Sequence, residues 1–236
     1  MEIIGNKALR FSADNPSRVV EFIPKSKIVG DDVLVHWGLD ECMVLKNMGV
    51  SGIPSPINKD YKWHGIFKPF AHQKETAAFL TLHKRAYCLN EMGTGKTSSV
   101  LWAADYLMDK GYIKRVLIVC PLSIMHSAWK ADAFKTIMHR SVGIAHGTRD
   151  VREAVIRGHS EIVVINYDGI ISVMDAIERA EFDLIVIDEY NHYKNAQTRR
   201  RLEYLQEIRV LKKFRCRCGS GSSPSTAKLQ KLMFGR

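Results

Sequence analysis

Helix-like stretches alternate with short, continuous apolar runs from about residue 63 onward. The apolar runs are Ala86–Leu89, Arg115–Cys120, Val142–His146, Ile162–Asn166 and Leu184–Asp188. The helix-like stretches are His72–Lys84, Lys96–Lys110, Ile124–Met138, Arg149–Arg157 and Ile170–Ala180. Runs rich in β-branched residues are typical of strands buried on both faces, so the alternation predicts an α/β fold with a central parallel sheet. In such sheets ligands bind at the carboxyl ends of the strands.

Residues 1–62 follow a different pattern, which predicts a small β-rich or mixed appendage. Turn-forming Asn, Asp, Gly and Pro separate four short apolar segments, Ala8–Phe11, Val19–Ile23, Val33–Val35 and Cys42–Leu45. We expect these four segments to be extended. The stretch Gly49–Pro56 has the composition of a linker or loop. No motif in the appendage indicates its role, which leaves a structural cap and an accessory that steers a partner as alternatives.

The strongest chemical signal is a glycine-rich run that follows a predicted strand and opens a predicted helix, Glu91-Met92-Gly93-Thr94-Gly95-Lys96-Thr97. Glycines let backbone N–H groups turn toward a phosphate, and the start of a helix adds partial positive charge. In a phosphate-binding loop Lys96 reaches the β- and γ-phosphates, and the Thr97 hydroxyl holds Mg²⁺. The general pattern has glycine five residues before Gly95, where this chain has Asn90. The alternative is a glycine-rich turn with a surface lysine.

A second signal, Asp188-Glu189, ends the last apolar run and lies 92 residues (188 − 96) after Lys96. A carboxylate that leaves a buried strand near a phosphate loop is well placed to bind Mg²⁺. The adjacent Glu189 can orient or deprotonate an attacking water. The dipeptide alone is also compatible with a solvated strand end. Together with the phosphate loop, it makes Lys96, Asp188 and Glu189 the candidate catalytic residues for attack of water on a phosphate.

These motifs resemble those of the first RecA-like domain of superfamily 2 helicases, most closely of their Swi/Snf-like double-stranded DNA translocase branch. The resemblance covers roughly residues 63–198 and implies that residues 63–200 form an ATP-binding domain that uses ATP and Mg²⁺. Pro69–Gln73 is similar to the family segment before the phosphate loop, whose glutamine recognises adenine, which implies that role for Gln73. The resemblance also implies that nucleotide is held by the loop residues Met92, Gly93, Thr94, Gly95, Lys96 and Thr97.

Two further segments are similar to family segments on the DNA side of the domain. They are Cys120–Trp129 and Ile165–Tyr167, and they imply DNA contacts, duplex DNA being favoured, by Pro121, Asn166 and Tyr167. Trp129 itself can be either a packing residue or a base-stacking residue, and we favour packing. After the Asp-Glu motif, Lys194-Asn195 is similar to the family's Lys-Asn continuation.

The chain departs from the family pattern after Asp188-Glu189. The fourth residue of that motif is usually His, whereas this chain has Asn191, followed by His192. The family continues with a Thr-Gly-Thr-Pro-like motif and a second RecA-like domain carrying an arginine finger, and we find neither in this sequence. The resemblance therefore implies that the chain alone is weakly active, and that a second RecA-like domain or chain completes the motor.

Residues 201–236 form a basic tail that we predict to be disordered or non-native. Of the net charge of +10, +9 lies from Arg199 to the end, so the basicity says little about DNA binding by the folded body. Leu202–Lys212 can form a helix, and the Gly/Ser/Arg-rich segment after it has the composition of a disordered segment. Our hypothesis is that residues from about 200 onward arise from a shifted reading frame or a truncated end.

Other classes of protein remain as alternatives. One is a non-catalytic, nucleotide-dependent module that binds DNA or protein, and another is a different phosphate-loop enzyme such as a nucleotide kinase. The sequence has no apolar run of membrane-spanning length and no signal peptide, so we expect an intracellular protein, cytoplasmic or in the nucleoid, with no membrane partner. The odd number of cysteines, five, favours buried, reduced thiols over disulfides.

Overall fold

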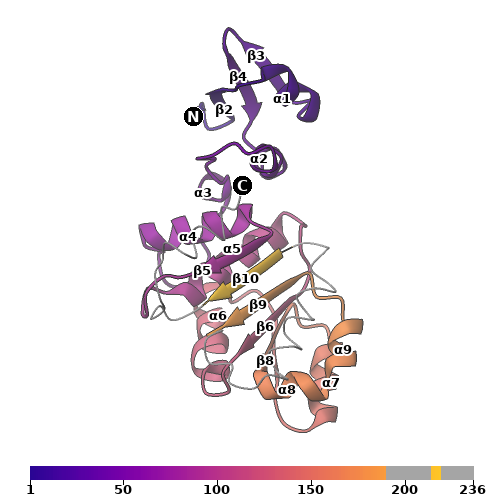
Figure 1. Cartoon of the computed structure of the whole chain (residues 1–236). Helices are drawn as coiled ribbons and strands as arrows, with labels where there is room; N and C mark the ends of the chain where they lie inside the picture. The colour runs from indigo at the N-terminus through magenta and orange to yellow at the C-terminus, as the bar shows by residue number, and fades with distance from the viewer. Residues whose placement is uncertain (190–213, 219–236) are drawn as a thin grey trace.

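An all-parallel sheet forms the centre of the computed structural model, which describes residues 1–189 and 214–218 (Figure 1). Within these residues the strand order is β5-β10-β9-β6-β8-β7, and every neighbouring pair is parallel. In that order the strands are Arg85–Cys88, Phe214–Cys218, Leu184–Asp188, Val116–Cys120, Ile162–Asn166 and Val142–Ala145. The predicted α/β fold with a central parallel sheet is confirmed.

Helices cover both faces of this sheet. Successive residues of a strand point to opposite faces, so alternate residues of each strand pack against different helices. Along β6, Val116 and Ile118 pack in one buried cluster, whereas Leu117 and Val119 pack in another. The first cluster includes α4 (Ala71–Leu82), α5 (Lys96–Asp109) and α6 (Ala131–Thr136), and the second includes α7 (Arg149–Arg157), α8 (Tyr167–Ser172) and α9 (Met174–Arg179). Burial on both sides is the reason that the strands are continuous apolar runs.

Two of the predicted helices are each divided in the structure. The stretch predicted as Ile124–Met138 begins with a π-helical turn, η1 (Met125–Lys130), and continues as α6. The stretch predicted as Ile170–Ala180 consists of α8 and α9, which are separated by Val173 with non-helical backbone angles of φ −128° and ψ 20°. Single π-helical turns are uncommon and often lie at functional sites.

The N-terminal part is an antiparallel sheet with three helices, as expected of a mixed appendage. Its strand order is β1-β2-β4-β3, and its elements are β1 (Glu2–Ile4), β2 (Ala8–Ser12), α1 (Pro16–Phe22), β3 (Ser26–Val29), β4 (Asp32–His36), α2 (Leu39–Asn47) and α3 (Ile57–Asp60). The predictions that Val19–Ile23 and Cys42–Leu45 are extended are wrong, because they lie largely or wholly in α1 and α2. Helix α1 is started by the Asn15 side chain, which accepts a hydrogen bond from the Arg18 N–H.

Strand β10 lies in the segment that we expected to be a disordered or non-native tail. Phe214–Cys218 pairs with β5 on one side and with β9 on the other. A strand in that position gains hydrogen bonds along both edges, and the alternation of Arg with Phe or Cys has the period of a strand. The structure differs from the prediction at these five residues. The predicted helix Leu202–Lys212 and the rest of the tail lie outside the described residues.

Three cysteines have described side chains, and all three are buried thiols: Cys42, Cys88 and Cys120. The prediction of buried, reduced thiols is confirmed for these three. Burial raises the pKa of the Cys42 thiol to about 12, which keeps it protonated and unreactive. Across residues 1–189 and 214–218, none of the helices has both the length and the apolar content that crossing a membrane requires.

The N-terminal part and the parallel-sheet part share one continuous hydrophobic core. Leu9 and Val35 of the antiparallel sheet belong to the same buried cluster as Leu101 of α5. Polar contacts cross the same boundary, since the Ser55 hydroxyl lies 2.7 Å from the Thr81 hydroxyl and the Tyr112 hydroxyl donates to Asp40 Oδ1 at 2.5 Å. The predicted boundary at residue 62 therefore does not coincide with a break in the core.

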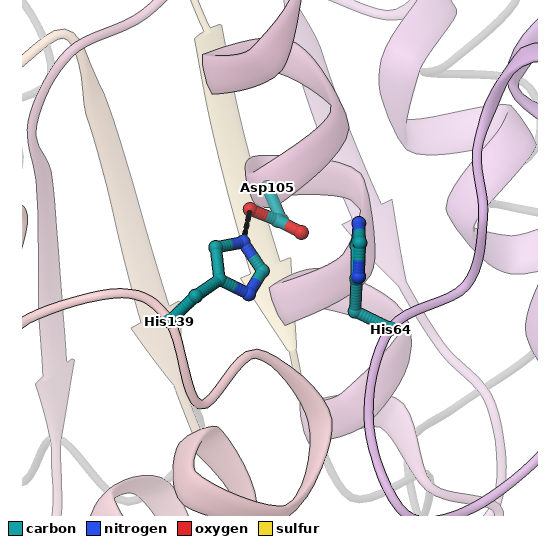
Figure 2. Close-up of side chains that lie close together, drawn as sticks. All are labelled: His64, Asp105 and His139. Carbon is teal, nitrogen blue, oxygen red and sulfur yellow. Dashed lines mark hydrogen bonds and ion pairs between the residues drawn. The ribbon is translucent and has the colours of Figure 1, made fainter.

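The polar centre of this boundary is Asp105, which is fully buried on α5 (Figure 2). Its Oδ1 accepts hydrogen bonds from Arg140 Nε at 2.6 Å and from His139 Nε2 at 3.0 Å. Its Oδ2 accepts from the Tyr61 hydroxyl at 2.5 Å. Burial, followed by the proximity of Asp105, raises the pKa of Tyr61 far above its ordinary value, so Tyr61 stays a donor.

His64, Asp105 and His139 bring three possible metal ligands within 4.8 Å of one another. However, the guanidinium of Arg140 lies 2.6 Å from the Asp105 oxygen that also accepts from His139, and Tyr61 uses the other oxygen. A cation at this point would face the Arg140 charge and would displace existing hydrogen bonds. We therefore interpret the cluster as a structural joint, in which Tyr61 of the N-terminal part donates to a carboxylate that His139 and Arg140 also contact.

Removing the charge of this joint is expected to destabilise the protein strongly. Asp105→Asn leaves Arg140 and His139 facing a neutral amide in a buried position, which costs about 3 kcal/mol of the free energy of unfolding. Asp60→Asn is the matched control, because Asp60 pairs with Lys59 and Lys110 at the partly exposed surface and contributes at most about 1 kcal/mol. Urea denaturation measures both, and equal losses in the two variants would contradict the buried joint.

Candidate nucleotide-binding site

The predicted site residues lie at the edge of the sheet where the parallel strands end. The predicted phosphate loop follows β5, Pro121 follows β6, Tyr167 follows β8 and Glu189 follows β9. Because β5, β9, β6 and β8 run in the same direction, their carboxyl ends meet at this edge (Figure 1). This is the edge at which open parallel sheets bind ligands.

The loop between β5 and α5 has the backbone that phosphate binding requires. Gly93 and Gly95 have φ angles of +76° and +73°, in the left-handed region that favours glycine. Helix α5 begins directly after Gly95, so its first N–H groups lie beside the loop. The ammonium group of Lys96 is folded into the loop, where it donates to the carbonyls of Asn90 at 2.8 Å and Glu91 at 2.9 Å.

The remaining loop residues are placed for different tasks. Thr97 is half-buried as the second residue of α5. Thr94 closes the loop on itself, since its hydroxyl donates to the Glu91 carbonyl at 2.8 Å. Met92 is 76% exposed at the tip. Its side chain is therefore free to contact a ligand, while its neighbours hold the turn.

Helix α4 supports the loop through two adjacent side chains. Gln73 Nε2 donates to the Thr94 carbonyl at 3.3 Å, and His72 Nε2 lies 3.0 Å from the same oxygen. The Gln73 side-chain oxygen accepts from the Phe70 N–H at 3.0 Å. The predicted adenine-recognising residue is therefore next to the predicted phosphate-binding loop. A Cβ on Gly95 would meet Gln73 Nε2 at 2.0 Å, so the close approach depends on glycine there.

Asn90 has a structural role that the sequence pattern did not reveal. Its Nδ2 donates to the Thr76 hydroxyl on α4 at 2.8 Å, and the Cys88 thiol donates to its Oδ1 at 3.6 Å. The residue that replaces the usual glycine therefore attaches the start of the loop to α4. Nothing in the local sequence indicates this contact, because Thr76 is fourteen residues away in the chain.

Asp188 ends β9 as a buried carboxylate with two hydrogen-bond donors. The Trp129 indole N–H donates to its Oδ2 at 3.0 Å, and the Glu189 N–H donates to its Oδ1 at 2.9 Å. Burial raises the pKa of Asp188, and the hydrogen bond from Trp129 opposes this shift. Glu189, the residue after the strand, has a left-handed backbone with φ +50°.

The segments predicted to contact DNA lie on the same edge with different exposures. Pro121 is partly exposed directly after β6, and Tyr167 is partly exposed at the start of α8. The Tyr167 hydroxyl donates to the Asp188 carbonyl. Asn166 is buried, which does not favour direct contact of its side chain with a ligand. Four residues discussed after the Asp-Glu motif lie outside the described part of the chain: Asn191, His192, Lys194 and Asn195.

Comparison with known proteins identifies the family of this chain. The family described as "Type III restriction enzyme, res subunit" matches residues 66–213. The chain belongs to this family. The chain is 29% identical over 118 residues to the ISWI chromatin-remodeling complex ATPase ISW2 of Saccharomyces cerevisiae. It is 30% identical over 142 residues to the human DNA repair and recombination protein RAD54B.

These sequence matches cover 46% and 53% of this chain but only 10% and 16% of the two curated proteins. Among solved structures, the SWI2/SNF2 ATPase core of Sulfolobus solfataricus in complex with dsDNA matches with a TM-score of 0.59 and 20% identity, covering 72% of this chain and 35% of that one. The UvsW helicase of bacteriophage T4 matches with a TM-score of 0.55 and 14% identity, covering 94% and 86%. The predicted resemblance to the first RecA-like domain of Swi/Snf-like helicases is confirmed.

The close contact between Gly95 and Gln73 generates a prediction about stability. In Gly95→Ala a left-handed alanine and a displaced Gln73 together lower the free energy of unfolding by about 2–3 kcal/mol. Gly93→Ala is the matched control, because its φ is nearly the same but no atom lies within 4 Å of the added Cβ. We expect the control to lose about 1 kcal/mol, from strain alone. Thermal unfolding without nucleotide compares them, and a Gly93→Ala loss as large as that of Gly95→Ala would contradict the contact.

Proposed function

We propose that this chain is the nucleotide-binding half of an ATP-driven DNA translocase, with residues 63–200 as its RecA-like ATP-binding domain. The observation that carries the proposal is a glycine-rich loop before α5, an adjoining Gln73 and the Asp188-Glu189 pair on one edge of a parallel sheet. The relatives support it, since they include a chromatin-remodeling ATPase and a DNA repair and recombination protein. In this proposal residues 1–62 are a cap on the domain.

The loop residues suit the triphosphate of ATP. Gly93 and Gly95 turn the backbone so that N–H groups can face the phosphates, and α5 adds the positive end of a helix of 14 residues. Lys96 now donates to two neutral carbonyls. Phosphate oxygens are charged and therefore stronger acceptors. We propose that the Lys96 ammonium leaves Asn90 and Glu91 for the β- and γ-phosphates when ATP binds.

The Thr97 hydroxyl and the Asp188 carboxylate are the residues we propose for Mg²⁺. They fit this ion because both are oxygen ligands, which Mg²⁺ prefers, and because donors on both Asp188 oxygens fix the orientation of that carboxylate. When bound, Mg²⁺ supplies positive charge that offsets the charge developing on the transferred phosphoryl group. Glu189, the next residue, is proposed to orient the attacking water and accept its proton.

We propose DNA as the partner of this edge, duplex DNA in the first instance. Contacts to phosphates give affinity without sequence preference. Pro121 and Tyr167 are partly exposed on this edge, and we propose that they contact such a backbone. One structural relative is a SWI2/SNF2 ATPase core in complex with dsDNA. A second RecA-like domain, on this or another chain, is proposed to supply the arginine finger that stabilises the transition state.

The central test is ATP turnover by the purified chain, with and without duplex DNA. We expect Lys96→Ala to weaken ATP binding at least tenfold, because a charged hydrogen bond to phosphate contributes about 1.5–3 kcal/mol, and to abolish any DNA-stimulated turnover. Lys110→Ala is the control, because Lys110 lies at the far end of α5. Wild-type ATP affinity in Lys96→Ala would reject the phosphate loop. Lys96-dependent binding without turnover, even with a second RecA-like domain added, would favour a non-catalytic module.

Gln73 is expected to discriminate adenine from guanine. Gln73→Ala removes the amide that can pair with the adenine edge, so the preference for ATP over GTP falls about tenfold. His72→Ala is the matched control, because His72 contacts the same Thr94 carbonyl from the neighbouring position of α4. Competition between ATP and GTP for a fluorescent nucleotide measures the preference. An equal loss of the preference for ATP in both variants would mean that Gln73 only supports the loop.

A further inference from the structure

The Asp188 carboxylate is held by a residue that lies 59 positions earlier in the chain. Trp129 donates its indole N–H to Asp188 Oδ2 at 3.0 Å, and both residues are buried. Trp129 lies on the π-helical turn η1 that follows β6, within the segment that begins at Pro121. A buried indole N–H needs an acceptor, and a carboxylate is a strong one.

The Asp188 side chain and backbone are both fixed from outside β9. Oδ2 accepts from Trp129, while the backbone carbonyl accepts from the Tyr167 hydroxyl at the start of α8. Oδ1 accepts from the N–H of the next residue, Glu189. The segments after β6 and after β8 therefore reach the same aspartate. These are the two segments that we propose to lie along DNA.

The π-helical turn explains how Trp129 reaches this position. A π turn inserts extra chain into a helix and rotates the side chains after it relative to a regular α-helix. The backbone at Ile124, with φ −105° and ψ 0°, starts this turn directly after the loop that follows β6. Trp129 is 1% exposed and packs in the hydrophobic cluster on the α5 face of the sheet. Its ring thus contributes to the core while its N–H contacts Asp188.

We infer that Trp129 is a positioning residue for the Mg²⁺-binding carboxylate, and that it connects the segment after β6 to the metal site. The inference rests on the proposed function. With Oδ2 held by the indole and Oδ1 by the Glu189 N–H, the carboxylate plane is fixed before any ligand arrives. Removing the indole N–H leaves the buried carboxylate with one donor fewer, so its orientation is less strongly fixed. Outer donors of this kind commonly change metal affinity by about 10–100-fold.

The test separates the hydrogen bond from the packing of the ring. Trp129→Phe keeps an aromatic side chain and loses the N–H. We expect the Mg²⁺ concentration for half-maximal binding of a fluorescent ATP analogue to rise about tenfold, while the affinity for the analogue in EDTA is unchanged. Trp102→Phe is the matched control, because it loses a buried indole N–H that donates to the His64 carbonyl, away from Asp188.

A second measurement needs no metal and no nucleotide. The chain has four tryptophans, so its indole N–H groups give a simple nuclear magnetic resonance spectrum. Asp188→Asn keeps the shape of the side chain and removes its charge. We expect it to move the Trp129 indole resonance and to leave that of Trp102 in place. Tyr167→Phe tests the second contact, and we expect a smaller rise in the Mg²⁺ requirement than in Trp129→Phe.

The outcomes distinguish this inference from the proposed function. If the wild-type chain binds the analogue with Mg²⁺ and Trp129→Phe has the same Mg²⁺ requirement as Trp102→Phe, Trp129 only packs and the inference is wrong. An unmoved Trp129 indole resonance in Asp188→Asn also overturns it. If the wild-type chain shows no Lys96-dependent binding, the proposed function fails and the inference falls with it. A higher Mg²⁺ requirement confined to Trp129→Phe and Tyr167→Phe supports it.

Discussion

Parallel pairing of β9 with β6 and β10 brings the carboxyl ends of the strands to one edge of the sheet. Lys96 and Asp188, 92 residues (188 − 96) apart in the chain, reach the same edge for this reason alone. An antiparallel sheet would place successive strand ends at opposite edges. The covering helices make this pairing possible, because each parallel connection must cross the sheet and bury a face of it.

The same constraint explains which features were predictable from the sequence. Strands buried on both faces must be apolar throughout, so β6, β8 and β9 can be recognised in the sequence as continuous apolar runs. The last residue of each run then marks the end of the strand. The glycine-rich loop after β5 is equally visible, because left-handed backbone at Gly93 and Gly95 limits the residue type. Helices α1 and α2 were missed because short amphipathic segments with few turns resemble strands, and tertiary packing decides between the two.

The contacts that sequence reasoning could not find are long-range and carried by common residue types. Asp105, Asn90 and Trp129 each contact residues from 14 to 59 positions away in the chain, and no local pattern marks them. A helical Asp, an Asn at the position of a usual glycine and an aromatic residue after a strand all have ordinary local explanations. Only the fold shows that Asp105 joins two parts of the core and that Trp129 reaches a carboxylate. Strand β10 differs again, because its place in the sheet depends on the neighbours that pair with it.

Lys96 and Asp188 form hydrogen bonds with neutral dipoles rather than with each other. Lys96 donates to two backbone carbonyls, and Asp188 accepts from an indole N–H and a backbone N–H. Across the described residues, no ion pair joins Lys96 to Asp188. An ion pair at this point would have to be broken when a phosphate and its cation enter, at a cost that rises with burial. Neutral partners hold both side chains in place, and charged ligands can replace these partners, because charge-assisted hydrogen bonds are stronger than hydrogen bonds to neutral groups. The arrangement is therefore suited to admit a negatively charged ligand next to Lys96 and a positively charged one next to Asp188.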